Sequence, residues 1–283
     1  MDIAQAITHV SLCAGYGGID LGLKRAISNL RTVAFSEIEG FAVANLVAKM
    51  EAGRLDPAPI WSDLKTFPWA EFRDRVDVLS GGYPCQPFSS AGKRRGKEDP
   101  RHLWPWIADG IRAMRPRICF FENVEGHISL GLREVVEELA SIGYATTWGI
   151  FSAAEVGAPH QRKRVFILAY GGSAGFSRYG GFEQIGLSKG WQTTEGCTTQ
   201  GCGFGSERVF WPSRPGQPQY KWEPPRVIEP ALGRDIDGPP GGLGYAELCR
   251  SCDNRTDELR LLGNGVVPAT AERAFKTLIK DLE

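Results

Sequence analysis

The stretch ITHVSLCAGYGGIDLGL, residues 7–23, decides the fold class, because a β-rich apolar run passes through a glycine-rich turn into a helical pattern. It predicts a strand over Ile7–Cys13 and a helix over Ile19–Ile27. Glycines in such a turn let the backbone approach a ligand, and the helix N-terminus offers unpaired N–H groups to an anionic group. The glycines do not follow the G-x-G-x-x-G spacing of dinucleotide-binding folds. The turn is therefore either a ligand-binding loop of another kind or a tight connection without a ligand.

Strand and helix patterns keep alternating to about residue 170. Further strands are predicted over Thr32–Ser36, Val76–Ser80, Arg117–Phe121, Ala145–Phe151 and Arg164–Ala169. Further helices are predicted over Gly40–Met50, Trp104–Met114 and Leu132–Ile142. This order is typical of βαβ units, and the non-helical connection between the last two strands favours an antiparallel pair there. The expected fold is α/β, with a mixed sheet that carries helices on both faces.

Three segments differ in character along the chain. Residues 1–170 form the expected α/β domain, and residues 171–257 are rich in Gly, Pro, Trp, Ser and Thr with few periodic apolar positions, as in a small irregular lobe. Residues 258–283 include AERAFKTLIKDL at 271–282, whose apolar positions recur at helical spacing. We expect this C-terminal helix to return to the first domain.

Composition narrows the class of protein. The 33 basic and 33 acidic residues balance, so binding to nucleic acid would have to come from local basic patches. Seven cysteines without a secretory signal argue for reduced thiols, and Cys13 and Cys119 lie in apolar strands as expected core residues. No apolar run reaches the roughly 18 to 20 residues of a membrane span. We therefore expect a cytoplasmic protein that does not associate with membranes.

A cysteine in a proline-bounded turn is the strongest candidate for a nucleophile. GGYPCQPFSSAG, residues 81–92, follows an apolar strand and places Cys85 at the carboxyl end of that strand, where open α/β sheets bind ligands. Nearby positive charge or N–H dipoles would activate a thiolate there. The basic run that follows at 93–97 is either a solvated loop or a phosphate contact beside this cysteine.

Charged residues also follow other predicted strands. Glu37 is placed where acids of nucleotide-binding folds hold ribose hydroxyls, although a solvated acid at a helix start fits equally well. Glu122 is either an active-site group or an acid at a helix N-terminus, because an unpartnered carboxylate is costly to bury. Arg162 and Arg164 occupy alternate positions leading into a strand, so we expect both to point to one face and to converge on an anion or a base edge.

Taken in order, these motifs resemble those of the cytosine-C5 DNA methyltransferases. AGYGG at 14–18 looks like the family's S-adenosylmethionine loop, PCQ at 84–86 like its nucleophile motif, and ENV at 122–124 like the motif of its catalytic acid. The RKR sequence at 162–164 looks like the family's RxR strand, and GNGV at 263–266 like its C-terminal GN motif. The resemblance covers the first 170 residues and the C-terminal segment, and it implies the family's Rossmann-like methyltransferase fold.

The resemblance assigns functions to the three segments and to individual residues. It makes 1–170 the catalytic and cofactor-binding domain and 171–257 the target-recognition lobe, with S-adenosylmethionine as cofactor and no metal. The implied cofactor-binding residues are Ala14, Gly15, Gly17, Gly18, Glu37, Ile38, Asp63, Leu64, Pro84, Leu103 and Asn264. The implied catalytic residues are Cys85, Glu122, Arg162 and Arg164. The implied substrate-binding residues are Gln86, Ser89, Lys93, Arg94, Arg95 and Asn123.

The resemblance also implies a mechanism and partners. The Cys85 thiolate would add to C6 of a cytosine flipped out of double-stranded DNA, which activates C5 for methylation. Glu122 would hydrogen-bond N3 and the exocyclic amine, and the two arginines would hold O2 and nearby anionic groups. The enzyme would act as a monomer, with a cognate restriction endonuclease as a genetic partner.

Several positions depart from the family pattern. Cys13 stands where members usually carry a Phe that stacks on adenine, and His160 stands where a Gln often precedes the RxR pair. The ninth motif is not recognisable, and GRDIDGPPGG at 233–242 is a candidate replacement.

The sequence leaves a metal site and other functions open. Four cysteines of the lobe form C-x4-C and C-x2-C pairs that could together bind zinc: Cys197, Cys202, Cys249 and Cys252. The same motifs fit a tRNA cytosine-C5 methyltransferase. A DNA-binding protein without catalysis is a weaker alternative, and the glycine spacing disfavours a nicotinamide-dependent oxidoreductase.

Overall fold

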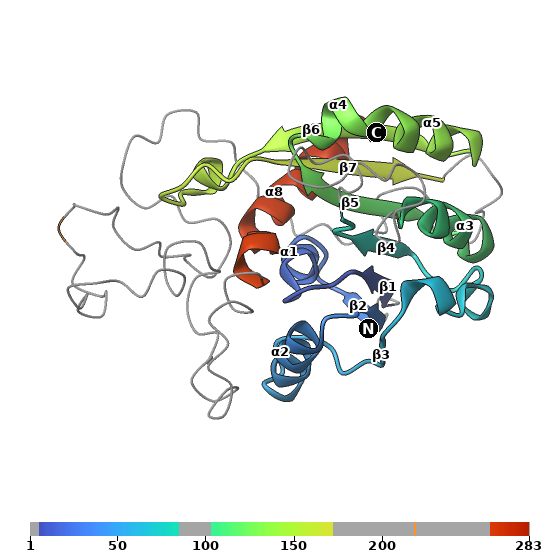
Figure 1. The fold of residues 1–283 in the computed structure, drawn as a ribbon, viewed down its shortest axis with the longest axis horizontal. Coiled ribbons are helices and arrows are strands. Elements are labelled where there is room, and N and C mark those ends of the chain that lie inside the picture. The colour runs from blue at the N-terminus through green and yellow to red at the C-terminus, as the bar shows by residue number, and fades with distance from the viewer. Residues whose placement is uncertain (1–5, 85–102, 172–217, 219–260, 283) are drawn as a thin grey trace, which may run out of the picture.

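A mixed β-sheet organises the chain in the computed structural model, which describes residues 6–84, 103–171, 218 and 261–282 (Figure 1). Within these residues the sheet has seven strands in the order β3-β2-β1-β4-β5-β7-β6. The strands are β1 (Ile7–Leu12), β2 (Leu30–Ser36), β3 (Ile60–Trp61), β4 (Val78–Gly81), β5 (Ile118–Val124), β6 (Ala145–Phe151) and β7 (Arg164–Tyr170). Neighbours from β3 to β5 are parallel, whereas β7 is antiparallel to both β5 and β6.

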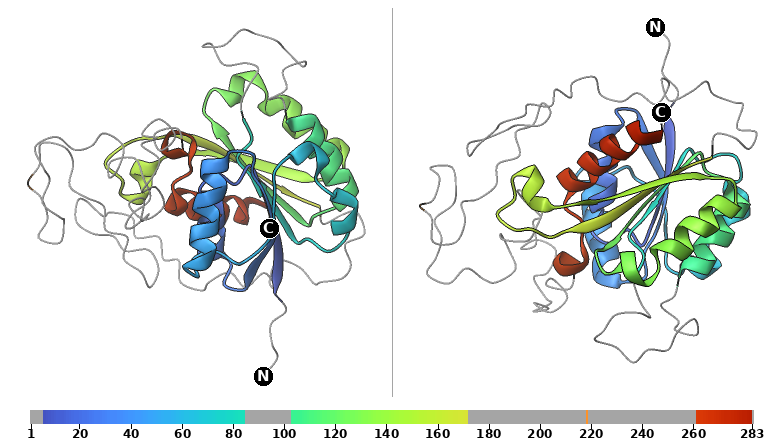
Figure 2. Two further views of the ribbon diagram at one scale, coloured as in Figure 1. Left: turned by 60° about the horizontal axis from the view of Figure 1, so that its bottom comes forward. Right: turned by 90° about the horizontal axis from the view of Figure 1, so that it is seen from above.

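Helices cover both faces of this sheet, as the two views in Figure 2 show. The longer helices are α1 (Gly18–Ala26), α2 (Gly40–Glu51), α3 (Trp104–Met114), α5 (Leu132–Ser141) and α8 (Pro268–Leu278). The shorter elements are α4 (His127–Leu130) and the 3-10 turns η1 (Leu64–Thr66), η2 (Trp69–Phe72), η4 (Ala153–Val156) and η6 (Lys280–Leu282). The expected α/β class, with a mixed sheet between two helical layers, is confirmed.

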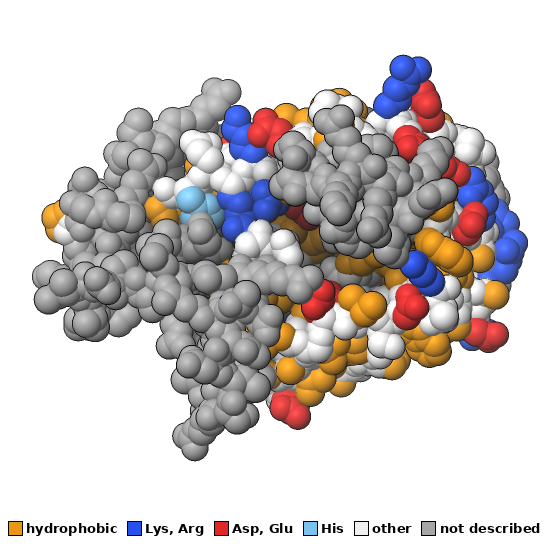
Figure 3. Space-filling model, viewed as in Figure 1, with side chains coloured by type: hydrophobic (Ala, Val, Ile, Leu, Met, Phe, Trp, Pro, Cys, Tyr) orange, Lys and Arg blue, Asp and Glu red, His pale blue; other side chains and the backbone are white. Residues whose placement is uncertain are grey.

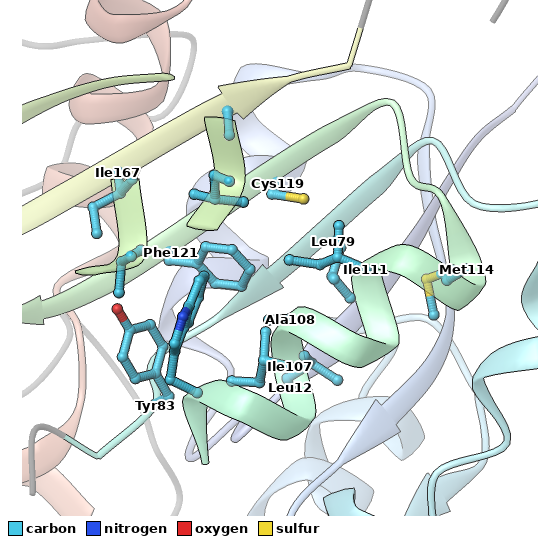
Figure 4. Packing of buried hydrophobic residues seen from close by; sticks show 14 of the residues in the cluster. Leu12, Leu79, Tyr83, Ile107, Ala108, Ile111, Met114, Cys119, Phe121 and Ile167 are labelled. Atoms are coloured by element: carbon cyan, nitrogen blue, oxygen red, sulfur yellow. The ribbon is translucent and has the colours of Figure 1, made fainter. Parts of the chain in front are cut away.

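Alternation along the central strands builds a separate core on each face. Cys119 and Phe121 of β5 pack in the cluster that includes α3 and α5, and Figure 4 shows Phe121 with Ile107 and Ala108 of α3. Phe120 of β5 packs in the other cluster, with side chains of α1 and α8. Both faces of β5 are therefore buried, which explains its nearly uninterrupted apolar sequence.

The C-terminal helix α8 returns to the first domain, as its periodicity predicts. It packs against α1, and the Phe275 ring lies 5.3 Å from the ring of Phe120. Close approach of the two helices requires a glycine, because a Cβ at Gly22 would lie 2.6 Å from the Pro268 carbonyl oxygen and 2.7 Å from Ala271 Cβ. Segments at opposite ends of the chain thus form one core.

The predicted element boundaries agree with the structure to within a few residues. The ranges of α3 and β6 match the prediction, and β6 and β7 form the expected antiparallel pair. β5 continues three residues beyond the predicted end, to Val124. Cys13 is a correction: it lies one residue past β1 with φ 48° and is half-buried, so it is not a strand residue, whereas Cys119 is the buried core residue expected.

Parts of the predicted organisation fall outside the described residues. The lobe at 171–257 is described only at Gly171 and Pro218, so its boundaries and the four cysteines considered for zinc lie beyond what the structure describes. Among the described residues, no helix has both the length and the apolar character that crossing a membrane requires.

The close contact at Gly22 gives a test of the fold. We expect Gly22→Ala to lower the free energy of unfolding by about 1–3 kcal/mol, because the added methyl group overpacks the interface of α1 with α8. Gly40→Ala is the matched control, since a Cβ there meets no atom within 4 Å. The measurement is urea unfolding of both variants, and equal stabilities would contradict the packing described here.

Candidate active site

Four strand ends and one strand start meet at a single edge of the sheet. Because β1, β2, β4 and β5 are parallel, the loops that follow them emerge on the same side. β7 runs the opposite way, and its first residue, Arg164, pairs with Val124 at the end of β5. Residues from distant parts of the sequence are thereby gathered at the edge where ligands of open α/β sheets bind.

The glycine-rich loop after β1 has an unusual backbone that a buried acid supports. Three of its residues have positive φ: Cys13 at 48°, Gly15 at 55° and Gly17 at 82°. The amide of Gly15 donates to Glu37 Oε2 at 2.7 Å, and the amide of Glu39 donates to Glu37 Oε1 at 2.9 Å. Each carboxylate oxygen has a second lone pair, so Glu37 supports the loop and can still accept bonds from ligand hydroxyls.

A second acid and two exposed apolar side chains follow β2 and β3. Asp63 caps η1 by accepting from the amide of Lys65 at 2.9 Å, and Leu64 is buried. Ile38 is 73% exposed, and Trp61 is 42% exposed. The Trp61 carbonyl accepts from the amide of Glu37 at 2.9 Å, so this tryptophan lies beside the first acid.

An ion pair between Glu122 and Arg164 lies at the centre of the site. Glu122 is 5% exposed, and its Oε1 accepts from Arg164 Nε at 2.8 Å. The carboxylate also lies against Gly82, where a Cβ would be 3.1 Å from Glu122 Oε2. This contact brings the acid beside the backbone of the segment that leads to Cys85.

Burial is the largest influence on the pKa of Glu122. Loss of solvent raises its pKa from 4.5 to about 7, although the positive charges of Arg164 and Arg162 act in the opposite direction. The acid can therefore hold or release a proton near neutral pH, which suits a group that protonates or hydrogen-bonds a substrate.

A set of aromatic and polar contacts fixes the chain just before Cys85. Tyr83 is buried against Phe121 and Trp104, as Figure 4 shows for Phe121, and its hydroxyl lies 3.0 Å from Nε2 of His127. The side chain of Asn123 donates to the Tyr83 carbonyl at 3.1 Å and accepts from the amide of Val124 at 2.9 Å. Asn123 thus holds backbone in the structure, and its predicted binding of substrate stays a prediction.

The position of Arg162 differs from the one that the sequence predicts. It lies before β7, with φ 37°, so strand alternation does not place it on one face with Arg164. Its guanidinium donates to the carbonyl oxygens of Leu262, Gly263 at 2.9 Å and Gly265 at 2.7 Å. Arg162 therefore binds the C-terminal segment, while its charge still acts on Glu122.

The remaining predicted residues fall into two groups. Pro84 is exposed, Leu103 precedes α3 and is half-buried, and Asn264 is exposed in a helical turn. The other candidates lie outside the described residues: Cys85, Gln86, Ser89, Lys93, Arg94 and Arg95.

Figure 3 shows one face of the molecule, on which Lys and Arg side chains lie beside a histidine. The described residues contain no cluster of His, Cys, Asp or Glu that could hold a metal ion.

Sequence reasoning missed four residues that shape this site. Tyr83 and His127 support the segment before Cys85, Trp61 lies beside Glu37, and Tyr16 of the glycine-rich loop contacts the C-terminal segment. Tyr83 and Tyr16 each stand inside a motif, and a large aromatic residue within a glycine-rich turn is the signal that could have identified them.

Comparison with known proteins identifies the family of the chain. The family described as C-5 cytosine-specific DNA methylase matches residues 7–196. The chain belongs to this family, and the resemblance drawn from its motifs is confirmed.

Individual relatives cover part of the chain. The Type II methyltransferase M.NgoMIV of Neisseria gonorrhoeae is 36% identical over 166 residues, which are 57% of this chain and 51% of that protein. M.AplI of Arthrospira platensis is 31% identical over 172 residues, 60% of this chain and 47% of that protein. The chain spans about half the length of the curated relatives it matches. Among solved structures, the S. pombe Dnmt2 methyltransferase has a TM-score of 0.47 and 24% identity, covering 58% of this chain and 50% of that one.

The raised pKa of Glu122 predicts a pH-dependent stability. An acid whose pKa is higher in the folded state stabilises fully below its unfolded pKa of about 4.5, and this stabilisation is lost as the pH rises through about 7. We expect the free energy of unfolding of the wild type to fall, relative to that of Glu122→Gln, between pH 5 and pH 8. Urea unfolding across this pH range measures the difference. Glu137→Gln, at a side chain that is 63% exposed, should give a flat difference, and the same flat result for Glu122→Gln would refute the raised pKa.

The contacts of Arg162 predict a local effect on the C-terminal segment. Arg162→Met removes the charged donor that binds these carbonyl groups, so we expect a loss of about 1.5–3 kcal/mol in the free energy of unfolding. We also expect faster hydrogen exchange at residues 261–267. Lys163→Ala, at a side chain that is 51% exposed, is the control. Unchanged exchange in this segment would show that Arg162 does not hold it.

Proposed function

We propose that this protein is an S-adenosylmethionine-dependent DNA (cytosine-5-)-methyltransferase. The observation that carries the proposal is the buried pair of Glu122 and Arg164 next to Gly82, three residues before Cys85. Family membership supports a methyl transfer to cytosine C5.

The glycine-rich loop fits the proposed cofactor. Glu37 has lone pairs left for the ribose hydroxyls, Asp63 has a second carboxylate oxygen for an amino group, and the loop backbone approaches without side-chain obstruction at Gly15. The exposed side chains of Ile38 and Trp61 offer the apolar surface that Cys13 cannot supply to an adenine ring. When bound, S-adenosylmethionine supplies an electrophilic methyl group.

In this proposal the residues of the chain activate the base. The Cys85 thiolate forms a bond to C6, and the displaced electron pair raises the nucleophilicity of C5. Glu122 carries or shares a proton with N3, which disperses the negative charge that develops on the ring. Arg164 orients Glu122 and is proposed to bind the base O2 as well. Once C5 carries the methyl group, loss of the C5 proton to solvent and departure of Cys85 as the thiolate would restore the C5–C6 double bond of the ring.

Double-stranded DNA is the proposed substrate. The relatives M.NgoMIV and M.AplI are both named Type II methyltransferases, which supports a role beside a restriction endonuclease. The target cytosine must leave the duplex to meet Cys85, and the basic residues at 93–97 are proposed to contact phosphates around it. The lobe at 171–257 is proposed to read the bases of the recognition site.

Labelled methyl transfer tests the proposal. The purified protein is incubated with labelled S-adenosylmethionine and either unmethylated duplex DNA or bulk tRNA, and methylated nucleosides are identified by mass spectrometry. We expect 5-methyldeoxycytidine from DNA, loss of product in Cys85→Ser with DNA binding retained, and a decrease of about 100-fold or more in Glu122→Gln. Product from tRNA alone would move the substrate to RNA, and wild-type rates in Cys85→Ser would overturn the mechanism.

A further inference from the structure

The C-terminal segment at residues 261–267 is held from two sides by side chains that bind its carbonyl groups. From one side, Arg162, two residues before β7, donates to three of these groups. From the other side, the hydroxyl of Tyr16 in the glycine-rich loop donates to the carbonyl of Val266. The segment therefore connects the loop after β1 with the residues that lead into β7, the strand that carries Arg164.

The Tyr16 ring fits tightly between α2 and this segment. It is 2% exposed, and the ammonium group of Lys49 lies 5.3 Å from its centroid. On the segment side, a Cβ at Gly265 would overlap ring carbons of Tyr16, and a Cβ at Gly18 would overlap the Val266 carbonyl oxygen. The glycines of both motifs thus permit the close contact that Tyr16 makes.

The loop that Tyr16 belongs to needs such support. Its backbone places Cys13, a residue with a Cβ, in the left-handed region, which costs roughly 1–2 kcal/mol. The amides of Gly15 and Gly17 are bound, by Glu37 and by the carbonyl of Ala14. Tyr16 lies between these two glycines and provides the side chain that ties the loop to residues 250 positions away.

We propose that Tyr16 is a positioning residue for the cofactor, whose hydroxyl holds the loop at 13–17 and the segment at 261–267 together in the conformation that binds S-adenosylmethionine. This inference rests on the proposed function, since it concerns the same cofactor. Without the hydroxyl, the binding-competent arrangement is populated only in part, and the apparent affinity falls by that fraction.

The test compares two tyrosine variants that lose the same kind of bond. Tyr16→Phe keeps the ring and removes the hydroxyl. Tyr144→Phe is the matched control, because the Tyr144 hydroxyl donates to the Pro116 carbonyl at 2.6 Å, is also buried, and lies at the amino ends of β5 and β6, away from the loop. Both variants lose one buried hydrogen bond, so a general loss of stability affects them alike.

Calorimetric binding of S-adenosylhomocysteine to the full chain is the first readout. We expect about three- to tenfold weaker binding for Tyr16→Phe and unchanged binding for Tyr144→Phe. In the methylation assay we expect the KM for S-adenosylmethionine to rise by the same factor in Tyr16→Phe, with kcat within about twofold of the wild type. Wild-type affinity in Tyr16→Phe, or equal weakening in both variants, would overturn the positioning role.

Hydrogen exchange of the wild type gives a second readout that needs no variant. S-adenosylhomocysteine should slow exchange in the loop at 13–17 and in the segment at 261–267 together, and protection of the loop alone would overturn the coupling. A wild type that binds this probe but methylates neither DNA nor tRNA would contradict the proposed function and leave the affinity comparison of the two tyrosine variants decisive. A wild type that does not bind it would overturn both proposals.

Discussion

The antiparallel pairing of β5 with β7 is the constraint on which the rest of the site depends. In this register Val124 lies opposite Arg164 and Glu122 opposite Phe166, so the arginine meets the acid at the edge where the parallel strands also end. A parallel β7 would begin at the opposite edge of the sheet, away from the glycine-rich loop. The reversal of one strand thus joins a basic group to a site that otherwise consists of loops after parallel strands.

In this ion pair, burial affects the pKa of Glu122 more strongly than the charged partner does. A buried pair of charges loses hydration that its mutual attraction only partly replaces. At Glu122 the loss of solvent outweighs the attraction of Arg164, and the pKa moves up to about 7. Gly82 leaves room for the carboxylate beside the chain that leads to Cys85. The site holds an acid that can carry a proton near neutral pH.

Residues near the two ends of the described chain pack together and share hydrogen bonds. α1 and α8 share a core, Gly22 sets their separation, and Tyr16 and Arg162 bind the carbonyl groups of the segment that precedes α8. The loop proposed to bind the cofactor is therefore built on residues from the C-terminal segment. Changes in that segment are expected to reach both the loop and the residues just before β7, because neighbouring carbonyl groups of the segment accept bonds from Tyr16 and from Arg162.

The sequence by itself determined the fold class, the family and the order of the strands and helices other than β3 and α4, because periodicity and short motifs are local properties of the chain. It also pointed to Glu37 and Glu122 as candidate site residues from their places after apolar strands. Tertiary structure alone decided what these groups contact. Alternation misplaced Arg162, because a positive φ before β7 turns it towards the C-terminal segment. The bond from Tyr16 to Val266 spans 250 positions and depends on how helices pack, which no local pattern records.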